Sequence, residues 1–199
     1  MVTPKLTSFN HAIYVISDSI DVLKKAVDDG AAAVQLRDKS GDLESIREKA
    51  RAMVLYKRSK NFIFILNDHP KLAVEVNADG VHIGQDYETA EARRIVGPDL
   101  IIGKSTHSIE QGLEAQKEEA NYISVGPVFL TPTKPGRKAV GLEYVREAAG
   151  KISLPFVAIG GIDLDNVGAV LEAGAKTIGV VRAASAVPQF LKLIGESGR

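Results

Sequence analysis

The chain alternates between short runs of aliphatic and β-branched residues and longer stretches with the period of amphipathic helices. The runs recur with a step of about 25 residues and have the length and composition of buried strands. They are AIYVIS (12–17), AAVQL (32–36), FIFIL (62–66), GVHI (80–83), LIIG (100–103), YISVG (122–126), FVAIG (156–160) and TIGVV (177–181).

Helical patterns fill the intervals between these runs. After the second run, apolar residues recur at spacings of three and four, at Leu43, Ile46, Ala50, Met53 and Val54, within a predicted helix over 42–59. Ser108 with Gln111 is typical of a capping box and predicts a helix through the 110s. Asp163 is the predicted N-cap of a helix over 164–173, and Gly174 stands where a C-cap is expected.

Eight strands alternating with eight helices predict a parallel α/β sheet, and eight strands are the number that closes a (β/α)₈ TIM barrel. We therefore expect a compact, single-domain barrel over residues 1–199. The length is short for this fold, so the helices must be short and the insertions few. An open doubly wound sheet is the alternative.

Composition narrows the classes of function. The 25 basic and 25 acidic residues cancel, so no overall field favours nucleic acid or an anionic membrane as a partner. The chain has no cysteine, which excludes disulfides and thiolate chemistry and favours a reducing, cytoplasmic location. No signal-peptide pattern opens the sequence, and no apolar run approaches the roughly 20 residues that span a bilayer.

The segment VQLRDKS (34–40) begins as a buried strand and continues into charged residues. On a continuing strand, Gln35, Arg37 and Lys39 point to one face and Val34 and Leu36 to the other. Polar side chains on the inner face are unfavourable unless something anionic or hydrogen-bonding meets them. The alternation therefore indicates a ligand inside the barrel.

The active site of a barrel lies at the carboxyl ends of its strands. The predicted ends carry cations, hydroxyls, an amide, carboxylates and glycines, a mixture that suits a polyanion with a metal ion. They are Ser17-Asp18, Arg37-Asp38-Lys39, Asn67-Asp68, Gly84-Gln85-Asp86, Lys104-Ser105-Thr106-His107, residues 131–134, Gly160-Gly161 and Arg182. For any single loop, ordinary solvated polarity is the alternative explanation.

Two loops favour phosphate binding. In AIGGID, Gly160 and Gly161 would let backbone N–H groups approach an anion, although tight packing of strand against helix also requires glycine. The long loop after the sixth run contains Thr131, Thr133 and Lys134, which could grip a phosphate and close over a substrate. A flexible solvated loop is the alternative.

The histidines show no metalloprotease spacing and no Ser/His/Asp arrangement. His82 falls within a predicted strand, where it is either a core residue or a catalyst, and His107 lies in a strand-end loop. Asp68, beside Asn67, is the best candidate for a hard-cation ligand, because Mg²⁺ takes few carboxylates and completes its shell with phosphate oxygens and water.

In this order the strand ends resemble the thiamine phosphate synthase (thiamine-phosphate pyrophosphorylase) family. The matching pieces are VQLRDKS, ILND, ADGVHIGQ, GKSTH, ISVGPVFLTPTK, VGLE, VAIGGI and the VV near the end, which together span nearly the whole chain. The resemblance implies a (β/α)₈ barrel that joins a hydroxymethylpyrimidine diphosphate to a thiazole phosphate. Thiamine phosphate and pyrophosphate are the products, and Mg²⁺ is the cofactor.

The resemblance also implies roles for individual residues. The pyrimidine diphosphate, or the pyrophosphate formed from it, would be held by Gln35, Arg37, Lys39, Asn67, Ser105 and Lys134. The thiazole phosphate would face Thr131, Thr133, Gly161 and the backbone at Val181 and Arg182. Asp68 would bind Mg²⁺, and the catalytic cations would be Arg37, Lys39 and Lys134, which stabilise the departing diphosphate.

The sequence departs from the family pattern at the second metal position. The usual aspartate is replaced by Tyr87, and Asp86 comes one residue early, so Asp86 is the predicted second ligand. Arg182 stands where serine is common. A thiazole tautomerase is an alternative, disfavoured because Pro127 replaces the histidine of one such enzyme, and a ligand-binding regulator without turnover is another.

Overall fold

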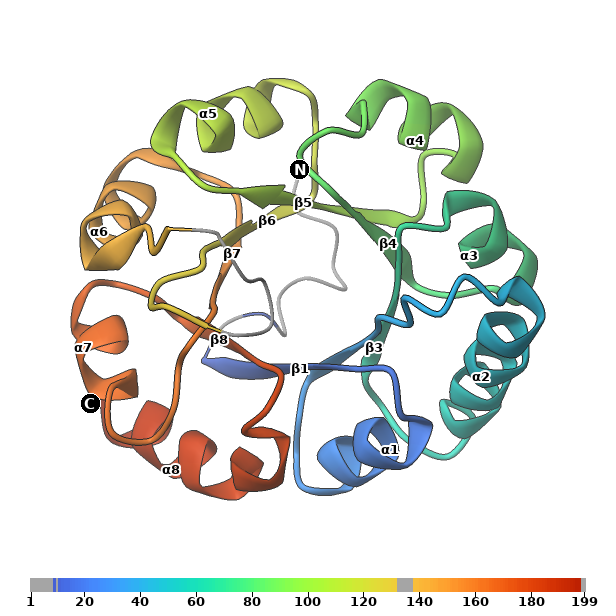
Figure 1. Cartoon of the computed structure of the whole chain (residues 1–199), viewed down its shortest axis with the longest axis horizontal. Coiled ribbons are helices and arrows are strands. Elements are labelled where there is room, and N and C mark those ends of the chain that lie inside the picture. The colour runs from blue at the N-terminus through green and yellow to red at the C-terminus, as the bar shows by residue number, and fades with distance from the viewer. Residues whose placement is uncertain (1–8, 10, 132–137, 198–199) are drawn as a thin grey trace.

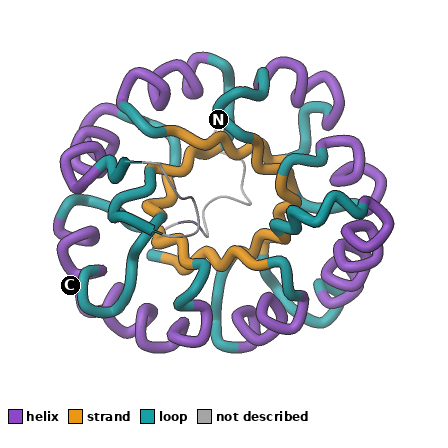
Figure 2. Tube along the Cα trace, viewed as in Figure 1, coloured by secondary structure: helices purple, strands orange, loops and turns teal. Residues whose placement is uncertain are grey.

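A computed structural model shows eight parallel strands closed into a barrel inside a ring of helices (Figures 1 and 2). It describes residue 9, residues 11–131 and residues 138–197. The strands are β1 Ala12–Ser17, β2 Ala33–Leu36, β3 Ile63–Asn67, β4 Gly80–Ile83, β5 Ile101–Thr106, β6 Tyr122–Val125, β7 Phe156–Ile159 and β8 Thr177–Val180. The helices are α1 Ile20–Asp28, α2 Leu43–Tyr56, α3 Pro70–Val76, α4 Thr89–Val96, α5 Ile109–Lys117, α6 Gly141–Lys151, α7 Val167–Glu172, the short 3₁₀ helix η2 Ala184–Ala186, and α8 Val187–Ser197.

Every strand pairs in parallel with the strands before and after it, and β1 pairs with both β2 and β8. Tyr14 lies opposite Ala33 on one side and Gly179 on the other. An open doubly wound sheet would leave two unpaired edges. The closed ring confirms the predicted (β/α)₈ barrel and rules out that alternative.

The alternation along each strand separates two hydrophobic layers. Outward-facing residues such as Val34 and Phe64 pack against the helices in one large cluster. Inward-facing residues form a second, smaller cluster inside the barrel, made of Phe9, Tyr14, Ala33, Ile63, Ile65, Ile101, Tyr122 and Val157. Since neighbouring side chains on a strand point to opposite faces, one strand contributes to both layers.

The strand ends differ from prediction mainly at β5, which runs to Thr106 instead of stopping near 103. Its outward Lys104 is accommodated because the ammonium lies 2.6 Å from a carboxylate oxygen of Glu118 and 3.2 Å from the Thr89 hydroxyl. Ser105 therefore lies within a strand and points into the barrel, where it lines the cavity.

Two predicted helix boundaries also shift. The helix expected from residue 164 begins at Val167, because the Asp163 carboxylate accepts hydrogen bonds from the Asp165 and Asn166 N–H groups in a preceding turn. The helix expected over 42–59 ends at Tyr56. The predicted cap at Ser108 is confirmed, since its hydroxyl accepts the N–H of Gln111.

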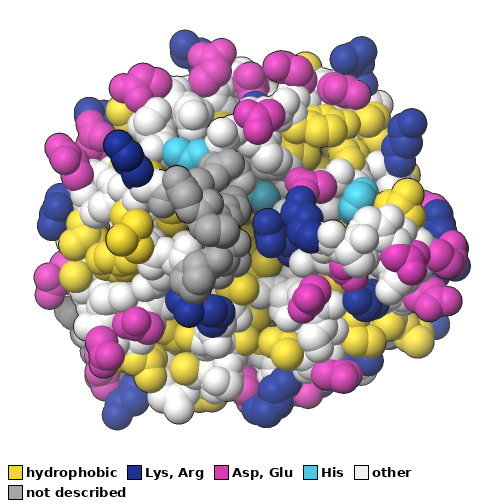
Figure 3. Space-filling model, viewed as in Figure 1, with side chains coloured by type: hydrophobic (Ala, Val, Ile, Leu, Met, Phe, Trp, Pro, Cys, Tyr) yellow, Lys and Arg dark blue, Asp and Glu magenta, His cyan; other side chains and the backbone are white. Residues whose placement is uncertain are grey.

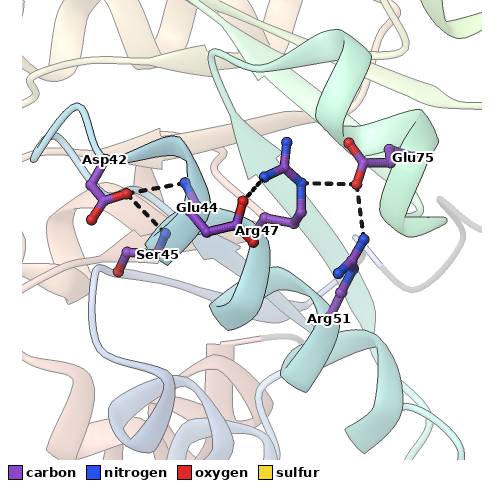
Figure 4. A network of polar contacts seen from close by, with 6 residues as sticks. All are labelled: Asp42, Glu44, Ser45, Arg47, Arg51 and Glu75. Atoms are coloured by element: carbon purple, nitrogen blue, oxygen red, sulfur yellow. Dashed lines mark hydrogen bonds and ion pairs between the residues drawn. The ribbon is translucent and has the colours of Figure 1, made fainter.

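Helix α2 is tied at its start and along its exposed side (Figure 4). The Asp42 carboxylate accepts hydrogen bonds from the Glu44 and Ser45 N–H groups, both at 3.1 Å, which satisfies donors of the first turn. Further along, Arg47 and Arg51 both donate to Glu75 of α3, at 2.9 and 3.0 Å. These contacts hold α2 beside α3 in the outer ring. Across residues 11–131 and 138–197, no helix is long and apolar enough to cross a membrane.

Candidate active site

A cavity of about 650 Å³ opens where the strands end, and every strand or the loop after it contributes to its wall. This size is typical of small-molecule sites, and the position is the one at which TIM barrels carry their active sites. In Figure 3, Lys and Arg side chains gather near the centre of the face that is viewed down the barrel. The opening therefore suits an anionic small molecule.

Most of the residues predicted for the site meet in this cavity. The lining includes Gln35, Arg37, Asn67, Ser105, Thr131, Gly161, Val181 and Arg182. Among the described residues, the predicted Lys39, Asp68 and Asp86 are outside the lining set. The predicted Thr133 and Lys134 lie outside the residues that the structure describes.

The end of β2 explains part of this arrangement. Gln35 is almost fully buried and its amide donates a hydrogen bond of 2.8 Å to the Tyr14 hydroxyl. The Arg37 N–H still pairs with the Ser17 carbonyl at 2.9 Å, so the inward alternation continues one residue past the strand. It does not continue to Lys39, whose ammonium instead contacts the Asp68 carboxylate.

A buried carboxylate fixes the loop between Arg37 and α2. Asp38 accepts hydrogen bonds from the Lys49 ammonium at 2.6 Å and from the Ser40 N–H at 2.8 Å. The bond from Lys49, helped by that of Ser40, lowers the pKa of the Asp38 carboxyl to about 2. The carboxylate is therefore charged at neutral pH and holds the loop to the first turns of α2.

The ends of β3 and β4 carry the predicted metal ligands. Asn67 lies opposite His82 in the sheet, and the next residue, Asp68, has a left-handed φ of 63° with its N–H bonded to the His82 carbonyl at 2.9 Å. The half-exposed Asp68 carboxylate already attracts one cation, the ammonium of Lys39. Asp86 is exposed in the turn after β4.

These oxygen donors on adjacent strand ends are of the kind that hard cations prefer. Within the described residues, no group of three or more His, Cys, Asp or Glu side chains could hold a metal ion. A Mg²⁺ ion held by Asp68 and Asp86 would have to take most of its ligands from a phosphorylated substrate and water.

A chain of hydrogen bonds crosses the floor of the cavity. The Tyr14 and Tyr122 hydroxyls lie 2.9 Å apart, Tyr122 Oη lies 2.9 Å from His82 Nδ1, and His82 Nε2 lies 3.0 Å from Ser105 Oγ. The sequence left His82 undecided and did not single out either tyrosine. Tyr14 lies between apolar residues in the first run, so nothing in the local sequence marks it. Space for the Tyr122 ring depends on Gly103, a residue distant in the sequence, where a Cβ would lie 2.1 Å from that ring.

The glycine pair after β7 lines the cavity with positive φ angles of 101° at Gly160 and 67° at Gly161. A Cβ at Gly160 would lie 2.5 Å from the Cα of Pro127, so close packing against the loop after β6 requires glycine there. The loop after β8 contributes Val181 and Arg182 to the same cavity. Phosphate binding by these two loops stays a prediction.

Comparison with known proteins agrees with this geometry. The family model for thiamine monophosphate synthase matches residues 10–184. The chain is 47% identical over 167 residues to the thiamine-phosphate synthase of Thermus thermophilus, covering 83% of this chain and 80% of that one. It is 44% identical over 166 residues to the enzyme of Shouchella clausii, covering 82% and 79%.

A third relative is longer, since the match to the thiamine-phosphate synthase of Synechocystis, 45% identical over 162 residues, covers 81% of this chain but 47% of that one. Among solved structures, the thiamine phosphate pyrophosphorylase of Pyrococcus furiosus superposes with a TM-score of 0.87 at 32% identity, covering 95% of this chain and 98% of that one. From the family match, the identities and the shared barrel, we conclude that this chain belongs to the thiamine monophosphate synthase family.

Proposed function

We propose that this protein is a thiamine phosphate synthase, a transferase that joins hydroxymethylpyrimidine diphosphate to a thiazole phosphate and releases pyrophosphate. The observation that carries the proposal is the 47% identity to a thiamine-phosphate synthase over 83% of the chain. The cavity supports it, because residues of the matching motifs converge there from separate strand ends.

The pyrimidine diphosphate would lie across the β2, β3 and β5 side of the cavity. Gln35, Asn67 and Ser105 offer hydrogen bonds to the ring, and Arg37 offers a planar pair of N–H donors to the diphosphate. Lys39 would reach the diphosphate by leaving its contact with Asp68. Lys134 is proposed for the same group, and it lies outside the described residues.

The thiazole phosphate would lie on the opposite side, against the loops after β6, β7 and β8. Thr131, Gly161 and the backbone at Val181 and Arg182 line that part of the cavity. The predicted Thr133 belongs to the same loop as Thr131 and lies outside the described residues. Backbone N–H groups at glycine-rich turns are suited to phosphate oxygens.

Asp68 would be the principal ligand of Mg²⁺, with Asp86 as a weaker partner. Mg²⁺, when bound, supplies positive charge to the oxygens of the diphosphate. The chain's own cations add to that charge.

The reaction proposed is a substitution at the carbon that carries the diphosphate. The C–O bond breaks, pyrophosphate leaves with the electron pair, and the thiazole nitrogen donates its lone pair to form the new C–N bond. A pyrimidine-stabilised cation is the species between these events. Such a reaction needs no protein nucleophile, and preorganised charge at the leaving group is the main contribution of the protein.

The test is to mix the purified protein with both substrates and Mg²⁺ and to measure pyrophosphate together with thiamine phosphate. The proposal requires equal amounts of both products, formed only when both substrates are present. Tight binding of the substrates without products would indicate a regulator instead.

A thiazole tautomerase would shift a proton of its substrate without the pyrimidine diphosphate. Pro127 lines the cavity and has no side-chain group that can transfer a proton, which disfavours this activity. Isomerisation of the thiazole in the absence of the pyrimidine, with no coupling to it, would overturn the synthase proposal.

A further inference from the structure

The floor of the cavity is one continuous hydrogen-bonded chain drawn from five strands. Its members in order are Gln35 of β2, Tyr14 of β1, Tyr122 of β6, His82 of β4 and Ser105 of β5, with successive distances of 2.8, 2.9, 2.9 and 3.0 Å. All five side chains are at most 9% exposed. The two ends of the chain, Gln35 and Ser105, are residues proposed above to contact the pyrimidine.

The number of available protons determines which group donates and which accepts in each hydrogen bond of this network. Each phenol has one proton, and among the described contacts Tyr14 Oη has Gln35 and Tyr122 as partners. Since the Gln35 amide N–H donates to Tyr14, the Tyr14 proton goes to Tyr122 and the Tyr122 proton to His82 Nδ1. His82 is then a neutral imidazole with its proton on Nε2, which it donates to Ser105 Oγ.

The reverse direction would leave one proton of the network without an acceptor. If His82 Nδ1 donated to Tyr122, the Tyr122 proton would point to Tyr14, whose oxygen already accepts from Gln35. The Tyr14 proton would then lack an acceptor in this chain at a site 1% exposed. A buried unpaired donor destabilises by about 1–3 kcal/mol, so the first direction is favoured.

The aromatic rings hold the chain in place. The Tyr14 and Tyr122 rings meet edge to face, and Phe9 and His82 pack against Tyr122 with ring centroids 5.1 and 5.5 Å away. Burial raises the pKa of both tyrosines above the ordinary value, so both keep their protons at neutral pH.

We propose that Tyr14, Tyr122 and His82 are positioning residues that set the hydrogen-bonding sense of Gln35 and Ser105, and so determine which pyrimidine the cavity accepts. The inference rests on the proposed function. Gln35, held by its amide N–H, presents its oxygen as an acceptor. Ser105 Oγ, already accepting from His82, presents its proton as a donor.

This arrangement favours a ring with a donor toward Gln35 and an acceptor toward Ser105. An aminopyrimidine offers both, since its amine donates and its ring nitrogens accept. With an oxo group in place of the amine, the oxo oxygen and the Gln35 amide oxygen would face each other, and both are acceptors. The floor therefore selects amino over oxo pyrimidines.

The first test is the tautomer of His82, measured by ¹⁵N NMR of protein labelled at histidine, with the His82→Gln variant to assign its signals. The direction derived above requires a proton on Nε2 and none on Nδ1 at neutral pH. A proton on Nδ1, in either the neutral or the charged ring, would overturn the proposal. The measurement needs no substrate, so it stands or fails independently of the synthase activity.

The second test compares Tyr122→Phe with the matched control Tyr144→Phe. Tyr144 of α6 is also buried, and its hydroxyl lies 2.6 Å from Thr106 Oγ1 on the helix side of β5. Tyr122→Phe should raise the KM for the pyrimidine diphosphate about tenfold, leave that for the thiazole phosphate unchanged, and move the His82 proton toward Nδ1. The control should change none of these.

If Tyr122→Phe matches Tyr144→Phe in KM and in the His82 tautomer, the tyrosine is only a packing residue and the proposal is wrong. Should Tyr122→Phe fail to fold, the tautomer in the unmutated protein decides the question. Absence of turnover in the unmutated protein would count against the synthase function and leave the tautomer result unaffected.

Discussion

At the scale of single residues, two cations of one loop occupy different environments. Arg37 lines the cavity, whereas the half-exposed Lys39 side chain pairs with Asp68 outside the cavity lining. The difference follows from the end of β2 at Leu36: alternation carries one residue further, and the loop then turns away. Of the two, only Arg37 would meet the proposed diphosphate without rearrangement.

Replacing Arg37 should therefore affect turnover strongly. Arg37→Ala is expected to lower kcat/KM by about 10²–10³ because a preorganised charge at the leaving group is lost. Arg37→Lys should restore activity only in part, since an ammonium cannot make the planar two-pronged contact. Arg51→Ala on the exposed side of α2 is the control for loss of an arginine. Near-normal steady-state rates in folded Arg37→Ala protein would contradict the diphosphate assignment.

The proposed metal ligands give a second prediction at this scale. Asp68→Ala should abolish Mg²⁺-dependent turnover, whereas Asp86→Ala should mainly raise the Mg²⁺ concentration required, because Asp86 is exposed and in a turn after β4. Titration of the initial rate with Mg²⁺ measures both effects. Synthase activity that survives full chelation would refute the metal assignment, and an unchanged Mg²⁺ requirement in Asp86→Ala would show that Asp68 acts without it.

At the scale of elements, the loop after β2 depends on one carboxylate. Asp38 ties the backbone of Ser40 and the side chain of Lys49 together, which holds the loop after β2 against α2. The pKa of Asp38 is held below the ordinary aspartate value of 3.8. Its stabilising effect is therefore present above that pH and is lost as the pH falls toward 2.

Asp38→Asn should lower the free energy of unfolding by about 1–2 kcal/mol at pH 7, after allowance for solvent around Lys49. The difference from the unmutated protein should shrink to about half at pH 3, because the carboxyl of the unfolded chain is then mostly protonated while that of the folded protein is still mostly ionised. Urea unfolding at the two pH values measures it. Glu147→Gln, which removes a surface ion pair with Lys151, is the control and should change stability by less than about 1 kcal/mol. A pH-independent loss in Asp38→Asn would show that the charge is not responsible.

At the scale of the whole molecule, the barrel wall separates stability from function. Outward side chains join the strands to the helices, and inward side chains near the strand ends form the cavity. Strand β3 contributes to both: Phe64 packs against the helices, and Asn67 lines the cavity.

This division predicts that Phe64→Leu destabilises the protein without changing its substrate binding. The ring is fully buried between β3 and the helices, so the loss of packing should lower the free energy of unfolding by about 1–2 kcal/mol. Denaturant unfolding and KM values for both substrates at low temperature measure the two effects. A changed KM for the pyrimidine diphosphate would show that the outer layer also shapes the cavity.

Local periodicity was sufficient to locate the ends of all eight strands to within three residues and to place Gln35 and Arg37 on the inner face. The position of a strand and the direction of its side chains depend on residues that are close in the sequence. The local order of apolar and polar residues therefore predicts them. The β5 boundary was predicted too early because polar residues 104–106 resemble a loop. Their partners, such as Glu118 and His82, are distant in the sequence.

The sequence by itself therefore determined the barrel, the faces of its strands and, through its motifs, the family of the protein. Only the tertiary structure decided that Lys39 meets Asp68 and that Tyr14, Tyr122 and His82 connect Gln35 to Ser105. Tyr14 and Tyr122 are 108 residues apart, yet their hydroxyls lie 2.9 Å from each other. The physical reason is that strand periodicity specifies which way a side chain points, whereas closure of the barrel specifies what it meets there.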